Sequence, residues 1–300
     1  MENQIQTGDV EKKEWYDKWY KLMLIPPVIL LLICCVYLFI FYGKNGDIMY
    51  RDASLSGGTT ITLNTDIDLK TLESQLKTSF PDVVVREISD LSNGKRIALI
   101  IESSTQPNDL KDGIEKILGY KLNEMNSSIE FTGPTLSQNF YKQLMIAIAI
   151  SFILMSIIVF FLFKTFVPSI AVIFAAFGDI VMPLALVDLL GIRLSAPGIA
   201  AFLMLIGYSV DTDILLTTRV LKKHEGSVNN RIYGSFKTGM FMTITALIAV
   251  LPAFFVVTGI PDSFKQIYLI LGIGLFADII NTWLTNASII KWYADKKGMQ

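Results

Sequence analysis

The sequence predicts a polytopic α-helical membrane protein that carries one α+β domain outside the membrane. Of its 300 residues, 52% are hydrophobic and only 18% are charged. The apolar residues gather in runs, and a run of about 20 residues is long enough for a helix to cross the bilayer core. Between the first two runs, residues 43–141 have the mixed composition of a soluble domain.

Six apolar runs form the predicted spans, at residues 22–42, 144–163, 166–190, 194–216, 238–258 and 267–290. The first is preceded by a polar segment and lacks a small-residue cleavage pattern near Tyr42 and Gly43, so we expect an uncleaved anchor. Its adjacent Cys34 and Cys35 are interpreted as small residues that face lipid or a neighbouring helix. The expected organisation is a cytoplasmic segment 1–21, a first transmembrane helix 22–42, an external domain 43–141, transmembrane helices two to six within 142–290, and a cytoplasmic tail 291–300.

Basic residues in the short loops predict the orientation. They concentrate in residues 219–237 and 291–297, with Lys164 on the same side, whereas Arg193 and Lys265 lie on the opposite connections. The positive-inside rule therefore places both termini in the cytoplasm and residues 43–141 outside the cell membrane. A net charge of -1 gives no indication of a nucleic-acid partner.

The external segment has the alternating and helical patterns of a small α+β domain. In chain order we expect a strand at 59–63, a helix at 68–80, strands at 83–88 and 96–101, a helix, and a strand at 128–133. Asn93-Gly94 is a tight-turn signal between the middle strands. The second helix should begin after Asn108 as its N-cap and stop at Gly119. This order is the ferredoxin-like βαββαβ arrangement.

Four carboxylates lie within the predicted spans, and burying a carboxylate in hydrocarbon costs several kcal/mol unless it is neutralised or paired. They are Asp179, Asp211, Asp213 and Asp278. One hypothesis is a proton or cation relay, because a carboxyl group in a low dielectric can change between its charged and neutral forms. The alternative is a set of interhelical hydrogen bonds that only fix the packing. Residues 211 and 213 differ by about 200° around a helix, so they cannot share one face.

Enzymatic chemistry is not expected from this sequence. It contains no nucleophile elbow, no Walker A loop and no set of clustered His or Cys ligands. The single histidine, His224, has no second ligand at metal spacing. We therefore expect no metal, no cofactor and no enzyme activity.

Several motifs resemble the SecF subunit of the SecD–SecF protein-export membrane complex, and the resemblance covers nearly the whole chain. SLSGGTTITL (54–63) is similar to the Gly-Gly-Thr signature of that family, here Gly57, Gly58 and Thr59. FTGPTLSQNF (131–140) resembles its Gly-Pro step before the second span. GYSVDTDILLTTRV (207–220) resembles its fourth-span signature, which starts here at Gly207, Tyr208 and Ser209, continues with an acidic pair and has an Arg near the cytoplasmic end.

Three positions depart from the family pattern. Gly178 replaces the histidine that usually precedes Asp179, Asp211-Thr212-Asp213 replaces an Asn-Asp step, and Lys237 replaces an Arg at the start of the fifth span. We interpret the chain as a divergent member, from an archaeal branch. The resemblance also suggests Arg219 and Lys237 as candidate charge partners of the carboxylates.

The resemblance implies a six-span half of the kind found in the resistance-nodulation-division (RND) superfamily. It further implies SecD as partner, the SecY translocon nearby, and a translocating polypeptide as substrate, with membrane lipid around the spans. The expected function is an accessory subunit that promotes protein export, coupled to proton or cation flow through the aspartates. Two alternatives stay open: half of an RND-type exporter of small solutes or lipids, and a passive scaffold of the translocon.

Overall fold

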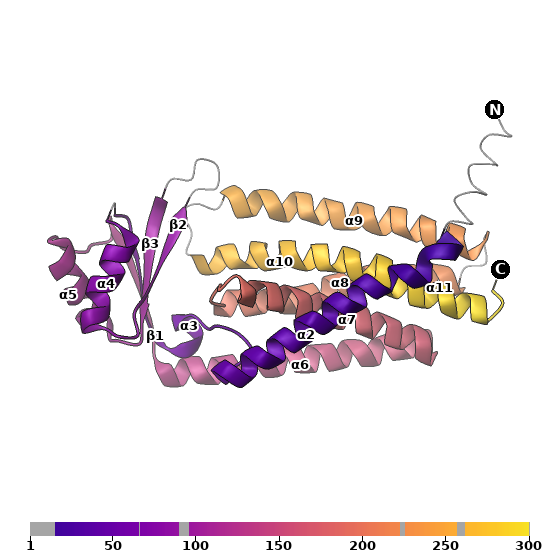
Figure 1. The fold of residues 1–300 in the computed structure, drawn as a ribbon, viewed down its shortest axis with the longest axis horizontal. Helices are drawn as coiled ribbons and strands as arrows, with labels where there is room; N and C mark the ends of the chain where they lie inside the picture. Colours follow the sequence, from indigo (N-terminus) through magenta and orange to yellow (C-terminus); the bar gives the residue numbers. More distant parts are fainter. Residues whose placement is uncertain (1–15, 66, 90–95, 223–225, 257–261, 300) are drawn as a thin grey trace, which may run out of the picture.

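The computed structural model sets a small α+β domain on one end of a bundle of long helices (Figure 1). It describes residues 16–65, 67–89, 96–222, 226–256 and 262–299. Among these, six helices are long and apolar enough to cross a membrane: Tyr16–Asn45, Pro134–Phe163, Phe166–Leu189, Ala196–Lys222, Val228–Phe255 and Lys265–Lys296. The predicted six spans are therefore confirmed as helices. The turn expected at Asn93-Gly94, and His224, lie outside the described residues.

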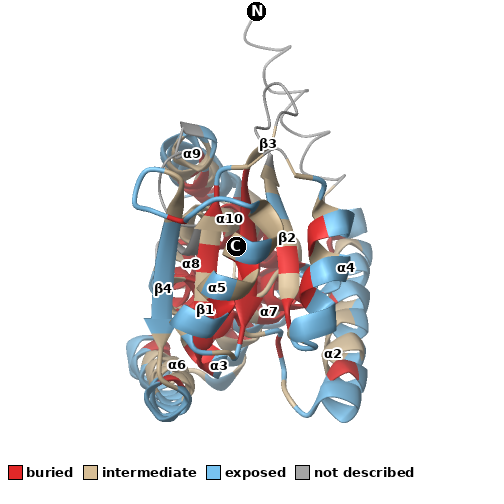
Figure 2. Cartoon of the chain, turned by 90° about the vertical axis from the view of Figure 1, so that its left-hand side faces the viewer, coloured by how far each residue is buried: buried red, intermediate tan, exposed pale blue. Residues whose placement is uncertain are grey.

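The spans divide into inner and outer helices. The inner ones are α7 (Phe166–Leu189), α8 (Ala196–Lys222) and the sixth span, which consists of α10 (Asp262–Ile280), a π-helix η1 (Asn281–Asn286) and α11 (Ala287–Lys296). The outer ones are α2 (Ile25–Asn45), α6 (Pro134–Phe163) and α9 (Val228–Val256), whose apolar side chains are mostly exposed. Figure 2 shows this division as buried residues on α7 and α8 and exposed ones on α2, α6 and α9. An apolar outer surface suits helices that face lipid.

The external domain has the predicted ferredoxin-like arrangement. Its elements are β1 (Gly58–Leu63), α4 (Leu69–Ser79), β2 (Val84–Ser89), β3 (Arg96–Ser103), α5 (Pro107–Leu118) and β4 (Ser127–Thr132), with the antiparallel strand order β2-β3-β1-β4. Apolar residues of α4 and α5, such as Leu76 and Ile114, pack on one face of the sheet against Ile61 and Ile101. The domain thus contains its own hydrophobic core.

One helix start differs from the prediction. Helix α5 begins at Pro107 with Gln106 at the N-cap position, so Asn108 lies inside the first turn. Proline suits the first helical position because its fixed φ is already helical and its missing N–H would have no partner there. Gly119 ends the helix as predicted, at a φ of 74°.

The Gly-Gly-Thr motif forms the junction between the bundle and the sheet. A short helix that the sequence did not predict, α3 (Ala53–Ser56), leads into Gly57 and Gly58, which have φ of +85° and +139°. A Cβ at Gly57 would collide with the Cα of Pro134, and one at Gly58 with the carbonyl of Ser103. Glycine is therefore required where β1 passes beside the start of α6. Thr59 fixes the junction by donating from Oγ1 to the carbonyl of Thr105 at 2.6 Å.

Candidate functional site

Three of the predicted carboxylates lie in the interior of the bundle. Asp179 is on α7, Asp213 on α8 and Asp278 on α10, and each is 0% exposed. They belong to three different spans, yet hydroxyl and amide side chains connect them. The structure thus brings together three of the four candidates.

Asp278 lies at the centre of the contacts. Its Oδ1 accepts hydrogen bonds from Thr212 Oγ1 at 2.9 Å and from Thr282 Oγ1 at 3.0 Å. Its Oδ2 is 3.5 Å from Thr243 Oγ1 on α9. One carboxylate therefore contacts side chains from the fourth, fifth and sixth spans.

Thr282 connects Asp278 to Asp213. Its Oγ1 is 2.9 Å from Asp213 Oδ1 as well as 3.0 Å from Asp278 Oδ1. A hydroxyl group has one proton to donate. When Thr282 donates to one carboxyl group, the other can bond to Thr282 only by donating a proton of its own. The hydroxyl thus joins two carboxyl groups in a geometry that allows a proton to pass between them.

The two carboxyl oxygens of Asp213 have different surroundings. Asn286 Nδ2 donates to Asp213 Oδ1 at 2.7 Å, whereas Oδ2 is buried and makes no hydrogen bond within the described residues. A buried carboxylate oxygen without a donor is unfavourable for the charged form.

Asp179 is held by neighbours on two helices. Ser209 Oγ on α8 donates a short bond to its Oδ2, and Asn281 Nδ2 donates to its Oδ1 at 2.7 Å. A Cβ at Gly178 would lie 2.7 Å from the amide nitrogen of Asn281. The missing side chain at Gly178 therefore provides the space that Asn281 occupies.

Within the described part of the chain, no basic side chain forms an ion pair with Asp179, Asp213 or Asp278. Of the two candidate charge partners, Arg219 donates to Thr238 Oγ1 at 3.2 Å, and Lys237 is exposed on α9. Three uncompensated charges in a low-dielectric interior would be very unfavourable. Burial therefore favours the uncharged form of these carboxyl groups.

Asp211 lies away from the cluster. It is exposed on α8, as is Gly207, and Met204 on the same helix is 50% exposed. Its separation from the buried Asp213 agrees with their angular offset around a helix. Of the fourth-span signature, Ser209 joins the site, while Tyr208 donates from its hydroxyl to the carbonyl of Met242 on α9 at 3.1 Å.

The uncharged members of the site were not predicted from the sequence. They are Ser209 in this role, Thr212, Thr243, Asn281, Thr282 and Asn286. One signal was available, because Asp278, Thr282 and Asn286 are spaced four residues apart, as are Ser209 and Asp213, and such pairs lie on one helix face. Among the described residues, no group of three or more His, Cys, Asp or Glu side chains could hold a metal ion.

Comparisons with known proteins identify relatives over most of the chain. Residues 114–296 match the family model described as protein export membrane protein SecD/SecF, C-terminal. The chain is 36% identical over 280 residues to the protein-export membrane protein SecF of Methanolacinia petrolearia, which covers 93% of this chain and 95% of the relative. It is also 36% identical over 283 residues to SecF of Methanocaldococcus jannaschii, covering 92% and 96%. The homologues are mostly archaeal.

A solved structure has the same fold. The crystal structure of SecDF, a translocon-associated membrane protein from Thermus thermophilus, superimposes with a TM-score of 0.75 at 17% identity. The match covers 93% of this chain and 38% of that longer chain. The likeness shows that the arrangement of six spans and external domain is that of one part of the SecDF chain.

Proposed function

This chain belongs to the SecD/SecF family of protein-export membrane proteins, as a SecF-type member, and from that premise we propose that it assists the Sec translocase by coupling ion movement to export. The family is one of accessory membrane subunits without enzyme activity. Its role here is to form a complex with a SecD-type subunit beside the SecY channel and to promote the passage of a polypeptide across the cell membrane.

The observation that carries the ion-coupled part is the position of Thr282. It lies between Asp213 and Asp278, and no basic side chain among the described residues pairs with either of them. A network fixed only for packing would not need carboxyl groups, since amides and hydroxyls also join helices. Acids in this setting change charge when a proton or cation arrives or leaves, and each change alters the contacts among three spans.

The exposed side of α8 supports a second six-span subunit as the partner. Helix α8 lies between α6 and α9 (Figure 2), and its exposed positions include Met204, Gly207 and Asp211. A carboxylate that faces hydrocarbon is costly, whereas a helix from a SecD-type subunit would cover Asp211 and could pair with it. In this proposal Asp211 belongs to the subunit interface.

The proposed orientation has both termini in the cytoplasm and residues 43–141 outside the cell. The start of the first span and α11 lie together at the end of the bundle opposite the external domain (Figure 1), where Lys291 forms an ion pair with Asp17 at 2.8 Å. Arg219 and Lys222 in the last turn of α8 and Lys296 in the last turn of α11 belong to this end of the helices, where the positive-inside rule favours a cytoplasmic side.

Asparagine variants test this function. Asp213→Asn and Asp278→Asn keep the shape of the side chain but cannot titrate, so export should fall while the amount of protein and the binding of the SecD-type partner stay normal. Asp112→Asn, at an exposed position of α5, is the matched control. A passive scaffold predicts the opposite pattern, in which the asparagine variants export normally and only leucine variants, which lose the interhelical hydrogen bonds, are defective.

A further inference from the structure

The loop 190–195, between α7 and α8, contacts both the helices that carry the buried carboxylates and the external domain. It joins the helix that carries Asp179 to the helix that carries Asp213. It is also hydrogen-bonded to α10, which carries Asp278, and to the external domain. The helices of all three buried carboxylates therefore meet at this loop.

The contact with α10 is made by Gln266. Its Oε1 accepts from the backbone N–H and the hydroxyl of Ser195, each at 2.9 Å, and its Nε2 donates to the carbonyl of Arg193 at 2.9 Å. Gln266 is buried, and it precedes Asp278 by 12 residues on the same helix. A straight helix of that length spans about 18 Å. Since one continuous helix joins Gln266 to Asp278, we expect a shift of α10 at the carboxylate site to reach the loop.

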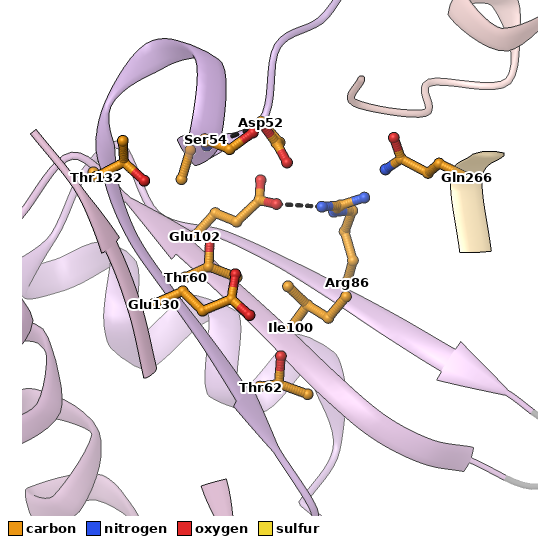
Figure 3. A pocket seen from close by; sticks show the side chains of 12 residues that line it. Asp52, Ser54, Thr60, Thr62, Arg86, Ile100, Glu102, Glu130, Thr132 and Gln266 are labelled. Atoms are coloured by element: carbon orange, nitrogen blue, oxygen red, sulfur yellow. Dashed lines mark hydrogen bonds and ion pairs between the residues drawn. The ribbon is translucent and has the colours of Figure 1, made fainter. Parts of the chain in front are cut away.

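The contact with the sheet is made by Arg193. Its guanidinium lies 3.4 Å from Oε2 of Glu102 on β3, and Glu102 is only 4% exposed. Arg86 of β2 pairs with the other carboxylate oxygen of Glu102, as Figure 3 shows. Figure 3 also shows that this polar face of the sheet is turned toward Gln266. A buried carboxylate that bonds two guanidinium groups resists displacement, because losing either partner would leave a buried charge poorly compensated.

Backbone contacts connect the loop to the segment before β1. Leu194 donates its N–H to the carbonyl of Tyr50 at 2.7 Å and accepts from the N–H of Asp52 at 3.0 Å. The N–H of Ala196 donates to Ser54 Oγ at 3.2 Å. The loop is therefore attached to the external domain at the sheet face and at the α3 junction.

We propose that loop 190–195 is the coupling element that transmits movement from the buried carboxylates to the external sheet, with Arg193 and Gln266 as its positioning residues. This inference rests on the proposed ion-coupled function. Arg193 and Gln266 act by keeping the loop bonded to α10 on one side and to β3 on the other.

The test measures the distance between the external domain and the bundle in the full chain bound to its SecD-type partner. Spin labels are placed at Lys116→Cys on α5 and Lys142→Cys on α6, both exposed, after Cys34 and Cys35 are replaced by serine. Asp278→Asn, which fixes that side chain in an uncharged form, should shift the distance by about 1–2 Å, the size of small helix displacements. In Arg193→Ala, and separately in Gln266→Ala, the same Asp278→Asn change should cause no shift.

Lys77→Ala is the matched control. It removes an ion pair with Glu73 inside α4 that does not reach the bundle, so the Asp278→Asn shift should persist. A shift that also persists in both Arg193→Ala and Gln266→Ala contradicts the coupling role of the loop and leaves the ion-coupled function standing. Absence of any shift with the intact loop contradicts the ion-coupled function, and the inference with it.

Discussion

Thr282 contacts two buried carboxyl groups with a single hydroxyl proton, at 2.9 Å from Asp213 and 3.0 Å from Asp278. Hydroxyl and amide groups, rather than basic side chains, surround all three acids. Hydroxyl and amide groups can both donate a hydrogen bond to a carboxylate. A hydroxyl oxygen can also accept a hydrogen bond from a protonated carboxyl group. The chemistry of the site therefore permits both charge states of each acid.

Removing the Thr282 hydroxyl should impair export. In Thr282→Val the shape is kept, but two carboxyl groups lose a partner worth about 1–2 kcal/mol, so we expect roughly tenfold lower export stimulation. Thr282→Ser should retain most of it. The measurement is the rate of secretion at equal protein level. Thr245→Val is the control, because that exposed hydroxyl bonds only the carbonyl of Phe241 on its own helix.

Asp52 gives the α3 junction a pH dependence. Burial raises the pKa of its carboxyl group to about 7, against hydrogen bonds from Ser54 that oppose the rise, and repulsion from Glu102 adds to it. The usual pKa of this carboxyl group is 3.8. Between about pH 4 and about pH 7, Asp52 therefore carries a proton in the folded protein but not in the unfolded chain. The stability of the junction should be greatest at low pH, fall as pH rises toward about 7, and level off above it.

Asp52→Asn should remove this dependence while Asn still accepts from the backbone of the α3 turn. The measurement is hydrogen exchange of the amides in residues 53–58 at about pH 5 and about pH 8, corrected for the intrinsic exchange rates. In the wild type, the free energy of opening at these amides should fall between the two pH values, by a few kcal/mol at most. The asparagine variant should show a flat profile. Equal pH dependence in both proteins would refute the assignment to Asp52.

At the level of elements, the sixth span is unusual because a π-helix interrupts it at the site. η1 contains Asn281, Thr282 and Asn286, which contact Asp179, Asp213 and Asp278. A π-helical turn is less stable than an α-helical one and occurs often at functional sites. Four polar residues are buried within its six positions, namely Asn281, Thr282, Thr285 and Asn286.

The external domain should fold without the bundle. Its core consists only of its own residues, with Leu72, Leu76, Leu110 and Ile114 fully buried. A fragment of residues 57–133 should therefore unfold cooperatively on heating, as followed by circular dichroism. Leu76→Ala should lower its free energy of unfolding by about 2–5 kcal/mol. A disordered fragment would mean that the sheet needs the bundle for stability.

The sequence predicted the elements whose signal is local. Six apolar runs located the spans, and alternation with turn signals located βαββαβ. The start of α6 and the presence of α3 were not predicted. Helix α6 starts at Pro134, ten residues before the predicted span, because its polar first turns lie beyond the apolar run. Helix α3 depends on the Asp52 cap and on the loop at Leu194, which no local pattern indicates.

The same reasoning applies to the site. Residue type and hydrophobic context identified Asp179, Asp213 and Asp278, since any acid in a span is a functional candidate. The offset of Asp211 from Asp213 was also predictable, but which of them faces the interior depends on how α8 packs. The role of Thr282 was not predictable, because threonine is common in spans and becomes distinctive only between two acids.

At the scale of the whole molecule, the two ends of the bundle should be on opposite sides of the membrane. With Cys34 and Cys35 replaced, a cysteine at exposed Thr78 on α4 should react with an impermeant thiol reagent added to intact cells. A cysteine at exposed Asn230, near the start of α9, should react only after the membrane is opened. Reaction of Asn230→Cys in intact cells would reverse the proposed orientation.

The arrangement of inner and outer helices determines which of the four acids are buried. The inner helices carry Asp179, Asp213 and Asp278, and the outer helices separate them from lipid. Asp211 remains on the uncovered part of α8, where a second subunit is proposed to lie. The chain by itself therefore buries three of the four carboxyl groups and leaves that of Asp211 exposed.

The most direct test of ion coupling is a flux measurement. Vesicles that contain the chain with its SecD-type partner and the translocon are loaded with a pH-sensitive dye and a sodium-sensitive dye, and a translocating polypeptide is added. We predict that export in the wild type is accompanied by movement of ions across the vesicle membrane, from the lumen outward when the polypeptide is translocated inward. Asp278→Asn should abolish this ion movement and slow export together, at equal protein content. Ion movement that is absent in the wild type, or unchanged in Asp278→Asn, would contradict the coupling role of the buried carboxylates.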